Sequence, residues 1–266
     1  MDCCGCADEW VVGVSELSKK SKPVKMRLDD LLVERGYFAD RGQALRAVIA
    51  GKVRVDDVYV TSAGMTVRED ADVFVKGVKR YVSRGGFKLQ GALDHFGFSP
   101  EGLRCVDVGS STGGFTDCLL QAGASNVTCV DVNYGQLDWT IRQDRRVAVF
   151  ERTNIRTANP QMLGAPFDVV VCDLSFIGLA GLVDVFASLC APGSTFIGLV
   201  KPQFESDHAE TDRGVVRDAS VRLRVVDEVV DALSQAGFFV DGAVESPITG
   251  PEGNVEYLVK ATYRPV

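Results

Sequence analysis

Four polar side chains have the types that proton transfer needs: Lys88, Asp173, Lys201 and Glu256. The apolar segments that end at Asp173 and Lys201 are typical of buried parallel strands, and the carboxyl ends of such strands meet at the ligand crevice of a doubly wound sheet. A partly desolvated lysine beside a cationic ligand loses its proton readily and can act as a general base. Asp173 would orient that amine but would also stabilise its charged form, so its net effect on the base stays open.

A glycine-rich turn lies between the first two of these residues. The buried-strand pattern over 104–109 runs into Ser-Ser-Thr-Gly113-Gly114, and a helix begins near Phe115. Glycine at these positions lets backbone approach a ligand without an intervening Cβ. The order G-x-x-x-G-G differs from the dinucleotide fingerprint G-x-G-x-x-G, and no lysine of P-loop type follows. The turn therefore predicts a nucleotide-type pocket of another kind.

Carboxylates at three strand ends indicate which nucleotide-like ligand this is. Asp131 ends the second strand, 24 positions after Asp107, where a carboxylate can bind both ribose hydroxyls of a nucleoside. Asp107 within the turn would repel a phosphate but attract a sulfonium or an amine. Together with Asp173, these residues favour S-adenosylmethionine over NAD as the cofactor.

Strands and helices alternate from Leu103 onward, which indicates a parallel sheet covered on both faces. We expect strands near 104–109, 127–131, 147–151, 168–173 and 195–200, and helices near 114–123, 135–143, 178–190 and 218–236. Two final strands, near 238–245 and 255–262, are close enough to pair antiparallel. The predicted fold class is α/β, a Rossmann-like methyltransferase-type sheet. Lys88 reaches the site only if a helix forms near 86–97.

The first 80 residues have a different pattern. Apolar residues at helical spacing predict helices over 27–36 and 40–51, with Asp40 capping the second, and period-two patterns then predict short strands. We therefore expect a tail over 1–25 that is disordered, a small α+β domain over 26–80, a linker over 81–88 and the larger domain over 89–266.

The charge is distributed unevenly along the chain. Residues 19–88 carry sixteen Lys or Arg against nine Asp or Glu, a net charge of +7, and the remainder carries −14. Basic side chains displace counterions from phosphate, so the leading part suits a polyanionic partner. The alternative is that these side chains only solvate a small domain. We expect neither a signal peptide nor a spanning helix, and hence a cytoplasmic location.

Five of the eight cysteines lie in or beside apolar runs and are expected to be reduced core residues. Cys3, Cys4 and Cys6 form a cluster near the start that could hold a metal. No histidine or second cysteine pair stands nearby to complete a tetrahedral set. A disordered tail is the other interpretation, and we expect no metal site.

The tetrad and its neighbouring motifs resemble a known family. Lys88, Asp173, Lys201 and Glu256 match the K-D-K-E tetrad of the FtsJ-type RNA 2′-O-methyltransferases. Four segments are similar to the TlyA family in particular, whose members also carry the label haemolysin: Ser83–Leu89, Asp107–Thr116, Asp173–Phe176 and Val200–Glu205. The leading domain resembles the RNA-binding domain of ribosomal protein S4 type that this family carries.

The resemblance implies methylation of a cytidine 2′-hydroxyl in 16S or 23S ribosomal RNA, or both, with ribosomal RNA or ribosomal subunits as partners. Lys201 would deprotonate the hydroxyl, Asp173 would orient Lys201, and Lys88 with Glu256 would position the ribose. The implied S-adenosylmethionine site comprises Asp107, Gly109, Ser110, Ser111, Gly113, Phe115, Asp131, Asn154 and Asp173. The basic side chains expected at the RNA are Arg27, Arg41, Arg46, Lys52, Arg54, Lys79, Arg80 and Arg84.

Three other functions stay open at the level of sequence. A non-catalytic RNA-binding protein could keep a methyltransferase fold as scaffold, but the intact tetrad disfavours it. A membrane-active haemolysin would need a membrane-seeking segment, and the sequence offers no spanning one. An enzyme of the same kind could also act on transfer RNA.

Overall fold

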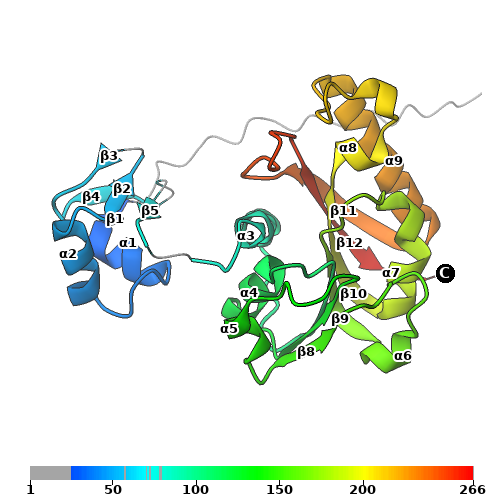
Figure 1. The fold of residues 1–266 in the computed structure, drawn as a ribbon, viewed down its shortest axis with the longest axis horizontal. Helices are drawn as coiled ribbons and strands as arrows, with labels where there is room; N and C mark the ends of the chain where they lie inside the picture. Colours follow the sequence, from blue (N-terminus) through cyan, green and yellow to red (C-terminus); the bar gives the residue numbers. More distant parts are fainter. Residues whose placement is uncertain (1–24, 57, 70, 72, 78–79, 266) are drawn as a thin grey trace, which may run out of the picture. The chain divides into compact units, whose positions relative to one another are not determined.

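The computed structural model describes residues 25–265, apart from 57, 70, 72, 78 and 79. The cluster of Cys3, Cys4 and Cys6, the tail to which it belongs, and Lys79 lie outside the described residues. The chain forms two compact units, the first ending at Arg80 and the second beginning at Tyr81 (Figure 1).

The first unit has the α+β character that the sequence predicts. Its described residues form two helices and five strands, which are α1 (Leu28–Glu34), α2 (Arg41–Ile49), β1 (Lys25–Arg27), β2 (Val53–Val55), β3 (Val58–Tyr59), β4 (Thr66–Arg68) and β5 (Val73–Val75). Strands β1 and β4 form one antiparallel pair, and β3, β2 and β5 form a three-stranded sheet. Asp40 caps α2 by accepting a hydrogen bond from the backbone of Gln43 at 2.8 Å. Apolar residues of both helices and most strands bury one shared core.

The second unit is built on a seven-stranded sheet in the order β11-β12-β10-β9-β6-β7-β8. The strands are β6 (Arg104–Val108), β7 (Asn126–Val130), β8 (Val147–Phe150), β9 (Phe167–Cys172), β10 (Cys190–Val200), β11 (Phe238–Glu245) and β12 (Tyr257–Tyr263). Five strands are parallel, as expected, and β11 and β12 pair antiparallel. Strand β12 lies between β11 and β10, antiparallel to both. The chain moves outward from β6 in both directions, so β6 and β9 flank the topological switch point at which α/β sheets bind ligands.

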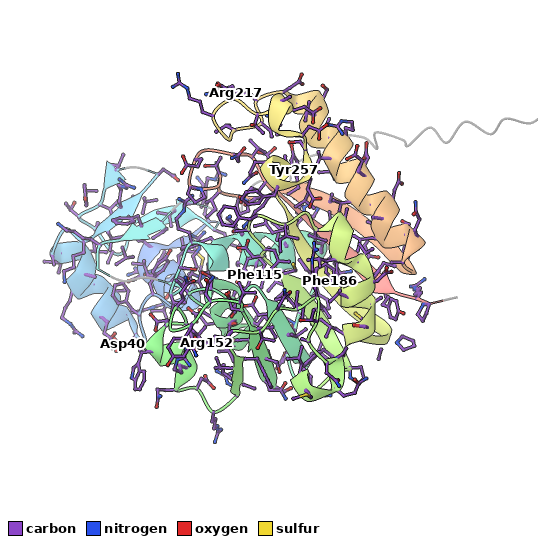
Figure 2. All side chains as sticks on the ribbon, turned by 45° about the vertical axis from the view of Figure 1, so that its right-hand side comes forward. Asp40, Phe115, Arg152, Phe186, Arg217 and Tyr257 are labelled. Atoms are coloured by element: carbon purple, nitrogen blue, oxygen red, sulfur yellow. The ribbon has the colours of Figure 1, made fainter. Side chains whose placement is uncertain are left out.

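Helices cover both faces of this sheet (Figure 1). One side carries α3 (Gly85–Phe96), α4 (Gly114–Gln121) and α5 (Trp139–Arg142); the other carries α6 (Pro160–Leu163), α7 (Val183–Leu189) and α9 (Ala219–Gln235). Phe115 and Phe186 belong to the cores on these two sides (Figure 2). The short helix α8 (Pro202–Glu205) follows β10, and 3-10 turns span Ala180–Leu182 (η1) and His208–Glu210 (η2).

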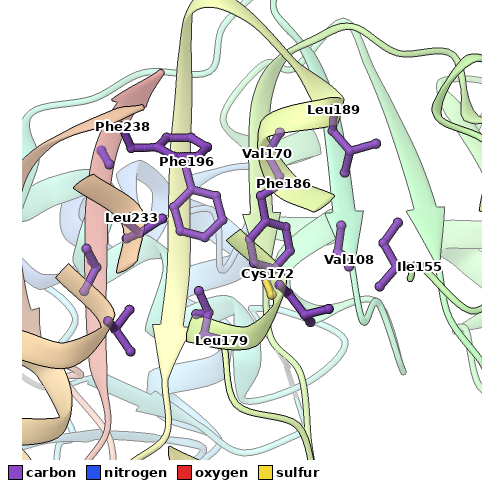
Figure 3. Packing of buried hydrophobic residues seen from close by; sticks show 14 of the residues in the cluster. Val108, Ile155, Val170, Cys172, Leu179, Phe186, Leu189, Phe196, Leu233 and Phe238 are labelled. Carbon is purple, nitrogen blue, oxygen red and sulfur yellow. The ribbon is translucent and has the colours of Figure 1, made fainter. Parts of the chain in front are cut away.

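Aromatic packing fixes β10, the strand that directly precedes Lys201. The ring of Phe196 on β10 lies 5.0 Å from that of Phe186 on α7 and 5.6 Å from that of Phe238 on β11 (Figure 3). All three side chains are buried. Buried aromatic pairs of this kind contribute about 0.5–1.5 kcal/mol beyond their burial. The end of β10 is therefore held by a rigid core.

Residues 81–88, expected to be a linker, are instead part of the second unit. Tyr81 is only 3% exposed, its hydroxyl donates to Gln90 at 2.7 Å, and α3 begins at Gly85. The glycines that suggested mobility serve close packing, since a Cβ on Gly86 would lie 2.2 Å from the ring of Tyr81. The helix that carries Lys88 is thus formed, close to the expected range.

Candidate active site

A cavity of about 710 Å³ opens at the carboxyl ends of β6, β9 and β10, within the second unit. Its volume lies in the range of small-molecule sites. All four tetrad residues line it: Lys88, Asp173, Lys201 and Glu256. The structure therefore brings together side chains that the sequence separates by up to 168 positions.

Lys201 and Asp173 form the first ion pair of the cavity. Because β9 and β10 are parallel neighbours, with Cys172 opposite Gly198, the residues that follow each strand emerge side by side. Lys201 Nζ lies 2.5 Å from Asp173 Oδ1 and also donates to Ser175 Oγ at 3.2 Å. The Lys201 side chain is 10% exposed. Its amine is thus oriented by two oxygens in a mostly dry setting.

Lys88 and Glu256 form the second ion pair, and both are nearly inaccessible, with side-chain exposures of 8% and 1%. Glu256 directly precedes β12, whose Tyr257 lies opposite Val200 on β10. Antiparallel pairing therefore places the residue before β12 beside the residue after β10, which is Lys201. Helix α3 supplies Lys88.

Asp107 is a buried acceptor on the cavity wall. Its Oδ2 accepts hydrogen bonds from the Thr116 backbone at 3.0 Å and from the Thr116 hydroxyl at 2.6 Å. Its Oδ1 is buried and has no hydrogen-bond partner among the described residues. Burial raises the pKa of Asp107 to about 7, against the opposing effect of Thr116. A cationic ligand group would satisfy the free oxygen and favour its charged form.

The turn after β6 brings two strand ends into contact. Gly109 has a φ of 84°, and a Cβ there would lie 2.6 Å from the carbonyl oxygen of Asp173. Only glycine fits this close approach in this conformation. Asp131, which directly follows β7, is joined to this turn by a hydrogen bond, because its Oδ2 accepts from the backbone amide of Ser111 at 2.7 Å.

The residues expected to hold the cofactor divide into two groups. Those that line the cavity are Asp107, Gly109, Ser110, Ser111, Phe115 and Asp173. Gly113, Asp131 and Asn154 are not among its lining residues. Gly113 starts α4 with a φ of 93°, and a Cβ there would lie 2.9 Å from Leu137. The side chain of Asn154 accepts from the backbone of Arg156 at 3.0 Å.

Several lining residues had no role assigned from sequence, and they come mostly from loops: Ser83, Thr112, Ser175, Phe176, Gln203, Phe204, Gly214, Thr249, Pro251, Glu252 and Asn254. Phe176 is the most conspicuous, because it is 88% exposed with a φ of 67°, a left-handed conformation uncommon for a bulky residue. Asn254 is 2% exposed and ties two loops, accepting from the Val216 backbone at 3.0 Å and donating to the Gly214 carbonyl at 2.9 Å. The sequence could have indicated Phe176, because it is an aromatic residue that follows Asp173 closely at the end of a buried strand.

The basic residues expected at RNA have varied surroundings. Arg27 and Arg41 form ion pairs with Asp29 and Asp30. Arg54 lies 5.0 Å from the ring of Phe74, and Arg84 lines the cavity and donates to the Thr249 carbonyl. Arg46 and Lys52 border a small hollow of about 350 Å³ beside α2. Arg80 ends the first unit.

The described residues contain neither a candidate metal site nor a candidate membrane span. Within 25–265 and its gaps as stated, no three His, Cys, Asp or Glu residues converge on a common metal position. Over the same part of the chain, no helix is long and apolar enough to cross a membrane.

The residues at this site fit S-adenosylmethionine. The cavity has the size for it, the carboxylates of Asp107 and Asp173 on its lining suit cationic groups, and Asp107 Oδ1 is buried with no hydrogen-bond partner among the described residues. Fold and site together define an S-adenosylmethionine-dependent methyltransferase. The sequence model of the FtsJ-like methyltransferases matches residues 81–263, and that of the S4 domain matches residues 26–73. The chain belongs to the FtsJ-like methyltransferase family and carries an S4 domain before the catalytic unit.

Relatives with curated descriptions agree with this assignment. The 16S/23S rRNA (cytidine-2′-O)-methyltransferase TlyA of Mycobacterium tuberculosis is 41% identical, over 88% of this chain and 89% of its own. Hemolysin A of Brachyspira hyodysenteriae is 36% identical, over 88% of this chain and 98% of its own. Among solved structures, a protein of Streptococcus thermophilus described as a candidate hemolysin superposes with a TM-score of 0.69 at 38% identity, over 92% of this chain and 90% of its own.

Proposed function

We propose that this protein methylates the 2′-hydroxyl of a cytidine in ribosomal RNA. The observation that carries the proposal is the convergence of Lys88, Asp173, Lys201 and Glu256 on one cavity, beside the glycine turn that suits a nucleoside cofactor. The curated activity of the Mycobacterium tuberculosis relative supports the choice of cytidine and of ribosomal RNA. A cytoplasmic location, where ribosomal RNA is found, goes with this proposal.

Lys201 acts as the general base in this proposal. S-adenosylmethionine, when bound, supplies a methyl group activated by its sulfonium. Lys201, as the neutral amine, would take the proton of the ribose hydroxyl while the oxygen accepts the methyl group, so the proton would end on the Lys201 amine. Asp173 and Ser175 hold that amine in place. Orientation and base catalysis of this kind need no covalent intermediate.

Lys88 and Glu256 position the ribose. Their ion pair lies on the cavity wall next to Lys201, and together they offer a donor and acceptors for sugar hydroxyls.

Phe176 receives the base of the target nucleotide. Its exposed ring stands at the cavity edge, 5.3 Å from the ring of Phe204, and aromatic rings stack on unpaired bases of single-stranded RNA. The first unit binds the surrounding RNA through phosphate contacts made by its basic side chains, among them Arg46 and Lys52.

Transfer of labelled methyl groups tests the proposal directly. Purified protein is incubated with labelled S-adenosylmethionine and with one of four substrates: small ribosomal subunits, large ribosomal subunits, free ribosomal RNA or transfer RNA. The methylated positions are then mapped by their resistance to alkali, since a 2′-O-methyl group blocks cleavage of the RNA backbone. We expect resistant linkages at cytidines of ribosomal RNA. Labelling confined to transfer RNA, or to a base rather than a ribose, would contradict the proposal.

A further inference from the structure

Glu205, outside the tetrad, joins the two loops that form one wall of the cavity. It ends α8, four residues after Lys201, and its carboxylate accepts hydrogen bonds from the backbone amides of Leu179 and Ala180. Those amides end the loop that follows β9, the loop that begins at Asp173. Glu205 thus connects the segment after β10 with the segment after β9.

The contact between these two segments is tight. A Cβ on Gly178 would lie 2.6 Å from Glu205 Oε2. Gly178 is not among the residues with positive φ, so glycine is needed there for space and not for backbone conformation. A second contact joins the same segments, because the rings of Phe176 and Phe204 lie 5.3 Å apart.

This connection acts on Ser175 and Phe176 more than on Asp173. The backbone of Asp173 is already anchored to the sheet, since its amide donates to the Val108 carbonyl at 3.1 Å. Ser175 is exposed and lies on the free part of the loop, yet its hydroxyl accepts from Lys201 at 3.2 Å. That hydrogen bond persists only if the loop stays packed against α8, and the hydrogen bond from Leu179 to Glu205 keeps the loop there.

The charge of Glu205 is kept in an unfavourable place. Burial raises the pKa of Glu205, the two backbone amides oppose that effect, and Glu228 on α9 adds to it. A partly buried carboxylate beside another carboxylate is a poor choice if only packing is required. An energetically unfavourable placement of a charge is expected where function requires it.

We propose that Glu205 is a positioning residue that clamps the Ser175–Phe176 loop against the helix after Lys201, so that the base and the stacking ring keep their places. This inference rests on the proposed role of Lys201. Glu205 itself lies outside the lining of the cavity and acts through Ser175 and Phe176.

The first test separates turnover from cofactor binding. Glu205→Ala is expected to lower kcat about tenfold or more, because a small misplacement of a catalytic group has a large effect on rate. KM for S-adenosylmethionine should stay within about twofold, since the cofactor turn is untouched. Glu205→Gln should recover part of kcat, because its amide oxygen can still accept one of the two hydrogen bonds. Asp231→Ala, which removes an exposed carboxylate from α9, is the matched control and should leave kcat unchanged.

The second test approaches the same contact from the loop. Gly178→Ala places a methyl group against the Glu205 carboxylate and should lower kcat by displacing the loop. In the Glu205→Ala background the clash with the carboxylate is removed and only the 3.3 Å contact with the Phe204 carbonyl remains, so Gly178→Ala should cause little further loss. Non-additivity of this kind identifies coupled residues.

The outcomes are distinct. Wild-type kcat in folded Glu205→Ala, or equal losses from Gly178→Ala in both backgrounds, would overturn the inference. If Glu205→Ala does not fold, Glu205→Gln and Gly178→Ala decide it. If the wild-type protein transfers no methyl group, the proposed function fails, and hydrogen exchange still tests the clamp. Faster exchange of the Leu179 and Ala180 amides in Glu205→Gln supports it, whereas unchanged exchange refutes it.

Discussion

The ammonium of Lys88 and the carboxylate of Glu256, 168 residues apart, form an ion pair that is almost closed to solvent. Removing one partner of a buried pair leaves an uncompensated charge. Lys88→Met should therefore lower the unfolding free energy of the second unit by about 3–5 kcal/mol. Urea unfolding followed by circular dichroism measures this. The double variant Lys88→Met with Glu256→Gln should be more stable than the single one, and a double variant as unstable as the two single losses added together would contradict the pairing.

Lys201 is predicted to be indispensable for turnover. Lys201→Ala should reduce methyl transfer by roughly 10²-fold or more, the usual contribution of a general base. Lys201→Arg should be equally inactive, because a guanidinium does not give up its proton. Binding of S-adenosylmethionine, measured by calorimetry, should persist in both. Lys260→Ala, which removes an amine paired with Asp241 on the sheet, serves as the control; unchanged transfer by Lys201→Ala would show that another group is the base.

Asp107 should give the cofactor-free protein a characteristic pH dependence. Burial raises its pKa from 3.8 to about 7. Between these values the folded protein holds a proton that the unfolded chain has lost, so this group favours folding at low pH, and its contribution is lost as the pH rises through 7. The Tm of the wild type, relative to that of Asp107→Asn, should therefore fall from about pH 4 to about pH 7 and level off above that. Parallel Tm curves for the two proteins would contradict this. Asp107→Asn should also weaken binding of S-adenosylmethionine.

Phe176 should matter for RNA and not for the cofactor. Stacking on a base contributes about 1–3 kcal/mol, so Phe176→Ala is expected to lower kcat/KM for RNA by about tenfold. Affinity for S-adenosylmethionine should be unaffected. The matched control is Phe239→Ala, another exposed aromatic, which lies on β11 and outside the cavity lining. Equal effects of the two substitutions on kcat/KM for RNA would contradict the proposed stacking of Phe176 on a base.

The basic side chains beside α2 should control the salt dependence of RNA binding. Replacing Arg46 and Lys52 by alanine removes two charges, and the slope of log affinity against log salt should become shallower by about 2. Binding of S-adenosylmethionine should not change, because the cavity lies within the second unit. A parallel loss of both affinities would show that the two units do not bind independently.

Much of the fold was predictable because its signals are local. The alternation of apolar strands and amphipathic helices predicted a doubly wound parallel sheet, and Asp40 marked the start of α2 through a cap that needs only three following residues. The order of β12 was not predictable in this way. Its insertion between β10 and β11 depends on side-chain packing across the sheet, which a period-two pattern does not record.

The tetrad residues also differ in how far their positions could be predicted from the sequence. Asp173 and Lys201 could be placed from sequence, because each directly follows a buried strand and neighbouring parallel strands end together. Lys88 and Glu256 matched a family motif, but their positions depend on a helix packed through glycine contacts and on antiparallel pairing to β10. Glu205 lies in a segment that resembles the TlyA family, but the sequence does not indicate its contact with the loop after β9.

The sequence by itself determined the class of fold, the type of cofactor and the residue types of the site, because periodicity, glycine spacing and strand-end charges act over short stretches of chain. Only the tertiary structure decided that residues 81–88 pack into the second unit, that Lys88 pairs with Glu256, and that Glu205 accepts a hydrogen bond from Leu179 in the loop bearing Ser175. These are contacts between segments distant in sequence, and their geometry follows from how sheet and helices pack together and not from any single segment.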